Sequence, residues 1–324
     1  MRTGEHKIEA LIKRLVATDR RAIARAISIV ENLRPEAQIL LRSVYFKTGH
    51  AYRVGITGPP GAGKSTIASK LARLYGEQGL KVGIIAVDPT SPFTGGALLG
   101  DRIRMSDVEL DDRVFIRSMA SRGSLGGLSQ TTQDVADVLD AAGFDMILLE
   151  TVGVGQSELD IVQAADTVIV VLVPESGDAI QAMKAGLMEI ADFFVLNKAD
   201  RPGADQAVIA LRTILALRPA TDGWTPAVLR AVASEAKGIE EISQLIAQHR
   251  EFQSSNNLLL KRRTARVQEK VKELVRQAIQ RDFWNEERRK LLESKLPLLL
   301  NHVVTPFDLA EELVANFKNG SCWV

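Results

Sequence analysis

Hydrophobic residues in the middle of the chain form short continuous runs, and longer stretches with helical spacing separate them. The runs are rich in β-branched residues and predict strands at Val54–Thr57, Val82–Val87, Val114–Ile116, Met146–Glu150, Thr167–Val173, Phe193–Leu196 and Ala227–Val232. The intervening stretches predict helices at Lys64–Gln78, Gln130–Ala142, Ala179–Ala191 and Gln206–Leu217. Such an alternation is typical of strands that are buried on both faces. It predicts an α/β fold with a mainly parallel, doubly wound sheet.

Both ends of the chain have helical periodicity without strands. Residues 8–48 predict one or two amphipathic helices, and Pro35 indicates a break before a third. After about residue 253, the apolar residues Val267, Val271, Leu274, Val275, Ala278 and Ile279 form one stripe on a long helix. We expect an N-terminal helical extension over 1–50, an α/β domain over 51–253 and a C-terminal helical arm over 254–324. The arm either mediates self-association, which we favour, or folds back on its own core.

Composition and charge exclude several classes of protein. The 324 residues are 46% hydrophobic and 25% charged, as in ordinary globular proteins. A net charge of +1 provides no overall field for nucleic acid or an anionic membrane. The first residues lack the apolar stretch of a signal peptide, and no apolar run could span a bilayer. We therefore expect a cytoplasmic protein with neither a membrane nor a nucleic-acid partner.

The cysteine, the histidines and the basic cluster do not predict a metal site, a disulfide or a nucleic-acid site. The one cysteine, Cys322, cannot form a disulfide framework or a thiolate metal site within one chain. The four histidines are scattered singly, so each is expected at the surface or as a helix cap. The basic cluster that begins at Lys261-Arg262-Arg263 is interleaved with glutamates, which favours a solvated helix face over a nucleic-acid site.

A glycine-rich segment after the first predicted strand is the most specific motif. It consists of Gly58, Pro59, Pro60, Gly61, Ala62, Gly63, Lys64, Ser65 and Thr66, and it fits the phosphate-loop pattern. In such a loop, backbone N–H groups and the positive end of the following helix hold phosphate oxygens. Lys64 would supply charge to the β and γ phosphates, and the Ser65 hydroxyl would bind Mg²⁺. Pro59 occupies the position of the second lysine in partition-type and iron–sulfur-carrier ATPases, which argues against that group.

The segment Asn197-Lys198-Ala199-Asp200 follows a later predicted strand and indicates that the base is guanine. The Asp200 carboxylate can accept hydrogen bonds from N1–H and the exocyclic amine of guanine, whereas adenine would leave it unpaired. Asn197 would join this loop to the phosphate loop, and the stem of Lys198 would cover the base. Further along, the Ala233 amide in the segment Val232-Ala233-Ser234 would contact the guanine oxygen. The predicted ligands are therefore GTP and GDP.

Three further segments are assigned to hydrolysis and to the metal. Glu150, at a strand end, would hold Mg²⁺ through a bound water, and the Gly153 N–H would meet the γ phosphate. The residue after this glycine is valine rather than the glutamine of signalling GTPases, so we expect slow intrinsic hydrolysis. Asp88 would position the attacking water, and Asp101 would ligate Mg²⁺; alternatively, Asp88 caps a turn or helix and Asp101 is a helix N-cap.

The assembled motifs resemble the methylmalonyl-CoA mutase-associated GTPases, once called lysine/arginine/ornithine transport kinases. The matching segments are GITGPPGAGKST, AVDPTSPFTGGALLGDRIRM, LGGLSQTT, ILLETVGVGQSE, GLMEIADFFVLNKAD and TPFDLAEEL. The resemblance implies a P-loop GTPase domain over 51–253 and a metallochaperone for an adenosylcobalamin-dependent acyl-CoA mutase. It also implies a homodimer through the C-terminal helices, and a loop from Pro174 to Lys184 that transmits the nucleotide state, with Lys184 among the catalytic switch residues.

Two departures and two alternative functions accompany this resemblance. Glu175 stands where the family usually has glycine, and Ala179 where it has an acid, so the mutase partner could differ. The first alternative is a GTP-dependent nickel-insertion factor of hydrogenase or urease, for which the sequence lacks histidine-rich or cysteine–histidine sites. The second is a targeting GTPase of the signal-recognition type, for which the six methionines are too dispersed.

Overall fold

A single parallel sheet forms the centre of the computed structural model, which describes residues 2–88, 111–120, 130–151, 157–174, 186–216 and 222–320. Its strands are β1 (Tyr52–Thr57), β2 (Val82–Asp88), β3 (Val114–Ala120), β4 (Met146–Glu150), β5 (Thr167–Leu172), β6 (Phe193–Leu196) and β7 (Val228–Arg230). They lie in the order β3-β2-β4-β1-β5-β6-β7, and every pairing is parallel. The strand order reverses direction at β1, which is where ligands bind in doubly wound sheets.

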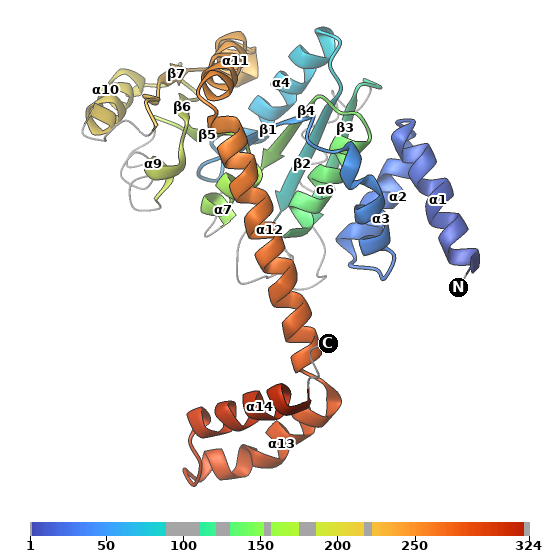
Figure 1. Ribbon diagram of the computed structural model, residues 1–324. Helices are drawn as coiled ribbons and strands as arrows, with labels where there is room; N and C mark the ends of the chain where they lie inside the picture. Colours follow the sequence, from blue (N-terminus) through green and yellow to red (C-terminus); the bar gives the residue numbers. More distant parts are fainter. Residues whose placement is uncertain are drawn as a thin grey trace. The chain divides into compact units, whose positions relative to one another are not determined.

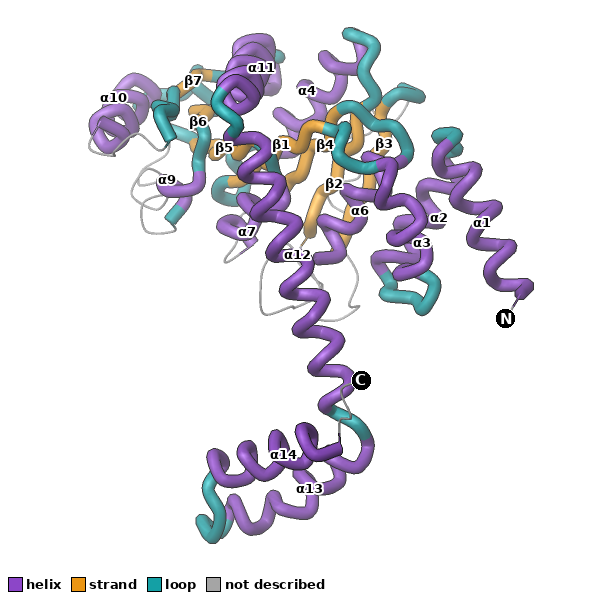
Figure 2. The backbone as a smooth tube through the Cα atoms, in the orientation of Figure 1, coloured by secondary structure: helices purple, strands orange, loops and turns teal. Residues whose placement is uncertain are grey.

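Helices cover both faces of the sheet (Figures 1 and 2). The helices of the described residues, including those beyond the sheet domain, are in chain order α1 (Arg2–Val16), α2 (Arg20–Glu31), α3 (Ala37–Val44), η1 (Tyr45–Lys47), α4 (Lys64–Glu77), α6 (Gln130–Ala141), α7 (Ser157–Ala164), α9 (Leu187–Ile190), α10 (Ala204–Ala216), η2 (Ala233–Glu235), α11 (Ile239–Ser255), α12 (Leu258–Phe283), α13 (Glu286–Leu300) and α14 (Pro306–Gly320). The predicted P-loop NTPase fold, a doubly wound parallel sheet with helical additions at both ends, is confirmed.

In several strands, alternate residues enter different hydrophobic cores. Val82 and Ile84 of β2 pack with α4 and α11, whereas Ile85 and Val87 of the same strand pack with α6 and the N-terminal helices. A third core joins β5 and β6 to α9 and α10. Because both sets of side chains are buried, the strands appear in the sequence as continuous hydrophobic runs instead of alternating ones.

The predicted elements agree with the structure in kind and differ in length. All seven predicted strands are present, but β3 extends to Ala120 and β7 is limited to Val228–Arg230. Helices α7 and α11 were not predicted, and of the predicted helix Ala179–Ala191 only the part from residue 186 is described, where α9 lies. The three N-terminal helices are confirmed, and Figure 1 shows α2 and α3 beside α6.

Within the N-terminal extension, helix α2 is fixed by local and long-range polar contacts. The Asp19 carboxylate caps α2 by accepting a hydrogen bond from the Ala22 N–H (2.9 Å) and also pairs with Arg14. Near the other end of α2, Glu31 pairs with Arg117 of the edge strand β3. The buried face of these helices joins the same core as α6. The extension therefore completes one face of the sheet.

His249 is buried, which contradicts the surface or capping position predicted for the histidines. Its Nδ1 lies 2.8 Å from the Thr167 hydroxyl, and its Nε2 lies 3.4 Å from the Asp192 carboxylate. Burial lowers the pKa of His249 below its usual value; Asp192 opposes the shift and Arg262 adds to it. His249 belongs to a polar network at the amino ends of β5 and β6.

Arg262 and Arg263 complete this network, and the prediction of a solvated helix face is wrong for both. Arg262 donates to both carboxylate oxygens of Asp192 (2.9 and 2.6 Å), and Arg263 donates to Asp166 (2.9 Å). Only Lys261 of the three consecutive basic residues has a mainly exposed side chain. The first turns of α12 are therefore joined to the core by ion pairs with carboxylates 70 and 97 positions earlier in the sequence.

The chain divides into two compact units, Met1–Arg263 and Thr264–Val324. In the second unit, α13 and α14 pack against each other. Helix α14 begins at Pro306, where the Thr305 hydroxyl accepts from the Asp308 N–H (3.2 Å). Arg288 lies over the rings of Phe283 and Phe317, 5.5 and 4.9 Å from their centroids. These contacts give the second unit its own small core.

Candidate functional site

The sheet brings the predicted site segments to one edge. The phosphate loop follows β1, Glu150 ends β4, Asn197 follows β6, and Val232 comes soon after β7. Because all these strands are parallel, their carboxyl ends lie at the same edge of the sheet. Four segments that are far apart in the sequence thus meet around the switch point at β1.

Two glycines in the phosphate loop are required by close contacts and by backbone conformation. Gly58 has φ +132°, and a Cβ atom at this position would lie 2.0 Å from the carbonyl oxygen of Val171 on β5. Gly63 has φ +93°, and a Cβ atom there would lie 2.2 Å from the side-chain nitrogen of Asn197. Neither position can accept a side chain without displacing its neighbours. The loop is therefore packed directly against the strands that carry the other site segments.

Lys64 occupies the first position of α4 and is buried. Its Nζ atom donates to the carbonyl oxygens of Gly58 (2.8 Å) and Pro59 (2.9 Å), so the ammonium group lies across the loop. Pro60 and Gly61 are the central residues of a turn from Pro59 to Ala62. The turn is closed by the Ala62 N–H, which donates to the Pro59 carbonyl (3.3 Å). Ser65 and Thr66 continue α4. This arrangement provides a positive charge at the start of a helix, as phosphate binding requires.

The Ser65 hydroxyl donates to the Glu150 carboxylate at 2.5 Å. The two residues are 85 positions apart in the sequence, and the pairing of β1 with β4 brings them together. A hydroxyl and a carboxylate oxygen are hard donors of the kind that Mg²⁺ prefers. The residues present at this point therefore fit a magnesium ion.

A second polar contact between the same strands was not predicted. The Thr151 hydroxyl donates to the Thr57 hydroxyl at 2.8 Å, and the Thr151 N–H donates to the Ile56 carbonyl at 3.1 Å. Thr57 is the last residue of β1, and Thr151 follows the last residue of β4. Their positions directly before Gly58 and directly after Glu150 were the only sequence signal that could have identified them.

Asn197 joins three site segments through its side chain. Its Nδ2 donates to the Ala62 carbonyl in the phosphate loop (2.8 Å), and its Oδ1 accepts from the Ala233 N–H (3.0 Å). This is the link to the phosphate loop that the sequence predicts. The Ala233 N–H, which the sequence assigns to the guanine oxygen, donates to Asn197 here. Val232 and Ser234 flank it, and Val232 forms an isolated bridge with Lys237.

The loop that carries Asp200 is joined to the end of β7 by its backbone and leaves the carboxylate exposed. Lys198 has a positive φ of 54°, and the Ala199 N–H donates to the Ala231 carbonyl (3.0 Å). Asp200 is exposed. The pKa of Lys237 is raised, mainly by its hydrogen bond to Glu235 and to a smaller extent by Asp200. The carboxylate that is expected to read the base is therefore accessible, and a cation lies close to it.

Four predicted site residues lie wholly or partly outside the described structure. Asp88 is the last residue of β2, so its backbone is at the carboxyl edge of the sheet, but its side chain is not described. Asp101, Gly153 and Lys184 lie outside the described residues. Their assignments remain predictions.

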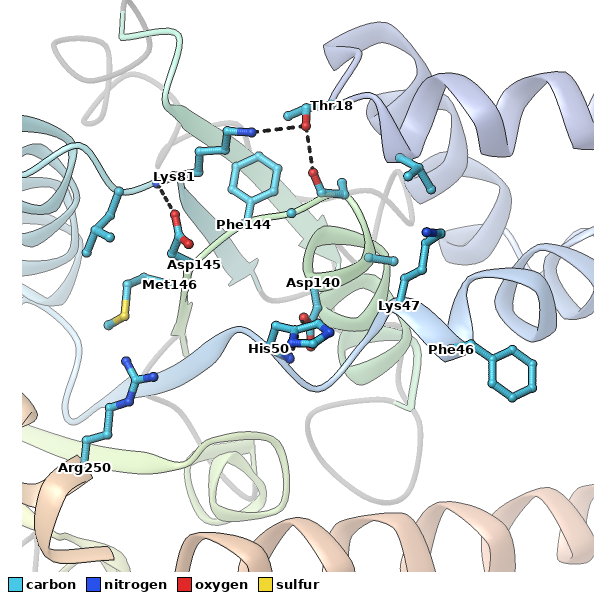
Figure 3. Close-up of a pocket in the computed structure, with 15 residues that line it drawn as sticks. Thr18, Phe46, Lys47, His50, Lys81, Asp140, Phe144, Asp145, Met146 and Arg250 are labelled. Carbon is cyan, nitrogen blue, oxygen red and sulfur yellow. Dashed lines mark hydrogen bonds between the residues drawn. The ribbon is translucent and has the colours of Figure 1, made fainter. Parts of the chain in front are cut away.

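A separate hollow lies at the opposite, amino edge of the sheet (Figure 3). It has a volume of about 650 Å³ and contains none of the motif residues. Its two acidic residues are already engaged: Asp140 accepts from the Ala51 N–H (3.0 Å), and Asp145 accepts from the Lys81 N–H (2.8 Å). Lys81 also donates to the Thr18 hydroxyl (3.3 Å), as the dashed lines show. These contacts join the N-terminal helices to the sheet, away from the candidate site.

Comparison with known proteins gives concordant results. The family model of the methylmalonyl-CoA mutase-associated GTPase MeaB matches residues 23–288. A protein of Pyrococcus horikoshii, whose name includes the word GTPase, is 48% identical over 307 residues, covering 94% of this chain and 96% of its own. The mouse protein "Methylmalonic aciduria type A homolog, mitochondrial" is 34% identical over 344 residues, covering 96% of this chain and 80% of its own. The crystal structure of a LAO/AO transport system kinase has a TM-score of 0.72 and 30% identity, and 97% of this chain and 98% of that chain are covered.

Proposed function

Since the chain belongs to the methylmalonyl-CoA mutase-associated GTPase family and hydrolyses GTP, we propose that it is a chaperone of an adenosylcobalamin-dependent acyl-CoA mutase. In this proposal, its GTP cycle gates the loading of the cofactor and protects the mutase. The family description supports a mutase of the methylmalonyl-CoA type as the partner. The mouse relative, whose name refers to methylmalonic aciduria, supports the same choice.

The geometry at the carboxyl edge supports a specific assignment of roles. The phosphate loop from Gly58 to Thr66 holds the phosphates of GTP or GDP, and Lys64 stabilises the charge on the β and γ phosphates. Asp200 reads the guanine base, while Asn197 and the Ala233 amide hold the base-binding loops together. The observation that carries this assignment is the Asn197 side chain, which bonds to both the phosphate loop and the Ala233 N–H.

Ser65 and Glu150 are the residues that would hold Mg²⁺, with Asp101 as a further candidate ligand. When bound, the ion would neutralise charge on the β and γ phosphates. Ser65 and Glu150 already meet at 2.5 Å, so the protein orients both oxygen donors in advance.

We propose slow intrinsic turnover of GTP. In this proposal Asp88 positions the attacking water, Gly153 contacts the γ phosphate, and Lys184 belongs to the switch loop.

A direct binding experiment tests the chaperone role. The full-length chain, loaded with a non-hydrolysable GTP analogue or with GDP, is mixed with a cobalamin-loaded methylmalonyl-CoA mutase. We expect the affinity of the two proteins to differ between the two nucleotides, and the GTPase rate to increase when the mutase is added. If the mutase neither binds nor changes the rate of hydrolysis, the proposed partner is wrong, although the GTPase activity itself would stand.

The nickel-insertion alternative has less support. The sequence contains one cysteine and four scattered histidines. In the part of the chain that the structure describes, no group of three or more His, Cys, Asp or Glu side chains is arranged to hold a metal.

Across the same residues, no helix is both long enough and apolar enough to cross a membrane. We keep the cytoplasm as the proposed location.

A homodimer through the C-terminal arm is also proposed. On α12, the stripe residues Val267, Val271, Leu274, Val275 and Ile279 are between 44% and 53% exposed in the single chain. These residues repeat at helical spacing, so they form one apolar face that a second copy could cover. The resemblance to the family supports a second copy of the chain as the occupant.

Val271→Glu is expected to convert the dimer to a monomer, because it places a charge in the centre of this apolar face. Gln280→Glu is the matched control: it adds the same charge, and at 100° per residue it lies on the opposite side of the same helix. Sedimentation equilibrium gives the mass of each variant. A dimeric Val271→Glu protein, or a monomeric wild type, would show that this face does not mediate self-association.

A further inference from the structure

Two buried threonines connect the strands that carry the phosphate loop and the Glu150 carboxylate. Thr57 and Thr151 are 0% and 1% exposed. They lie at the ends of neighbouring parallel strands, where Ile56 of β1 is in register with Glu150 of β4. Each is therefore one residue away from a predicted nucleotide or metal contact: Thr57 precedes Gly58, and Thr151 follows Glu150.

The hydrogen bond between the two hydroxyls extends the pairing of these strands beyond the sheet. The last regular pair is Ile56 with Glu150, and the Thr151 N–H then donates to the Ile56 carbonyl (3.1 Å). The hydroxyl bond from Thr151 to Thr57 (2.8 Å) comes one residue further on. Hydroxyl hydrogen bonds restrict both distance and direction, whereas apolar contacts restrict neither strongly. The pair thus fixes Thr151, the residue that directly follows Glu150.

We propose that Thr57 and Thr151 are positioning residues that hold the Glu150 carboxylate against Ser65 and thereby tune the contribution of Mg²⁺ to nucleotide binding and hydrolysis. The bond from the Ser65 hydroxyl to Glu150 is 2.5 Å long, so a small displacement of β4 relative to the phosphate loop would break it. The two threonines join the end of β1, which leads into the phosphate loop with Ser65, to the end of β4, which carries Glu150. The inference rests on the magnesium and GTP site proposed above, and it is independent of the mutase partner.

Thr151→Val and Thr57→Val test the proposal, because valine has nearly the shape of threonine but lacks the hydroxyl. Fluorescent GTP and GDP are titrated with and without Mg²⁺, and kcat and KM for GTP are measured in parallel. We expect each variant to need an about tenfold higher Mg²⁺ concentration for half-maximal tightening of GTP binding, and kcat to fall by about the same factor. Affinity in the absence of Mg²⁺ should stay within about twofold, and Thr151→Ser should restore the wild-type behaviour.

Thr167→Val is the matched control. Thr167 is equally buried, is also hydrogen bonded and lies on β5, which is paired with β1, but it sits at the amino edge of the sheet. The same chemical change there should lower the melting temperature without changing the Mg²⁺ dependence.

The double variant with valine at both 57 and 151 separates stability from positioning. Its melting temperature should fall by less than the sum of the single effects, because no hydroxyl is left unpaired. Its Mg²⁺ dependence should remain impaired.

The proposal is overturned if Thr151→Val and Thr57→Val keep the Mg²⁺ dependence of the wild type, or if Thr167→Val alters it to the same extent. A failure of the site itself has a different signature. If wild-type GTP binding does not respond to Mg²⁺, or if the Lys64→Ala variant binds GTP as tightly as the wild type, the nucleotide site is assigned wrongly, and this inference is wrong as well.

Discussion

Lys64→Ala is expected to lower the rate of GTP hydrolysis by on the order of a thousandfold, because a single positioned cation supplies this much stabilisation in comparable phosphoryl-transfer sites. Lys64 is buried at the start of α4, and its ammonium group already lies across the carbonyls of Gly58 and Pro59. Its charge is therefore oriented before the nucleotide arrives. Single-turnover hydrolysis of GTP, measured with the protein in excess, gives the change in the chemical step.

Lys70→Ala is the control for this variant. It makes the same substitution on the same helix, about one turn beyond the end of the phosphate loop at Thr66, and it should hydrolyse GTP at the wild-type rate. Both variants should have the same oligomeric state as the wild type, because neither residue lies on the second unit. Normal turnover by Lys64→Ala would contradict the assignment of the phosphate loop.

Asp200→Asn is expected to weaken GTP binding by on the order of a hundredfold or more and to create affinity for xanthosine triphosphate. In the proposed site the carboxylate would accept two hydrogen bonds from guanine, and hydrogen bonds to a charged group each contribute about 1.5–3 kcal/mol. An asparagine would turn a donor toward the exocyclic amine of guanine, but the same donor matches the carbonyl of xanthine. Competition of both nucleotides against a fluorescent analogue measures the reversal.

Asp205→Asn is the matched control, since Asp205 is an exposed carboxylate five positions further along that pairs with Arg230 (2.7 Å). Its replacement should leave the preference for guanine unchanged. Unchanged GTP affinity in Asp200→Asn, or tight binding of ATP by the wild type, would mean that another group selects the base. Nucleotide-free protein gives the baseline for both variants.

The fold could be predicted largely from the sequence because its strands are buried on both faces. Val82, Ile84, Ile85 and Val87 supply side chains to two different cores, so the strand β2 is an uninterrupted hydrophobic run with β-branched residues. Helices α7 (Ser157–Ala164) and α11 (Ile239–Ser255) were missed because both have only weak helical patterning. The end of β3 was missed because Arg117 and Ser118 interrupt the hydrophobic run.

The chemistry of the site was also readable to the extent that it depends on local backbone geometry. A phosphate loop needs glycines at fixed positions and a helix directly behind them, and both requirements lie within Gly58–Thr66. The same holds for Asn197 and Asp200, which follow a strand directly. The family resemblance rested on segments of this kind, and the family match over residues 23–288 confirms it.

By itself, the sequence determined where the strands lie, that a glycine-rich loop precedes a helix at Gly58–Thr66, and to which family the chain belongs, because each of these features depends on neighbours in the chain. Apart from the Asn197 link to the phosphate loop, which distant groups meet was decided only by the tertiary structure. Arg262 looked solvated beside its helical neighbours, yet its partner Asp192 lies 70 positions earlier. His249 looked isolated, and the only sequence signal for the Thr57–Thr151 bond was the position of each threonine beside a predicted site residue. Such contacts depend on the order and register of the strands, and neither can be predicted from a short segment of the sequence.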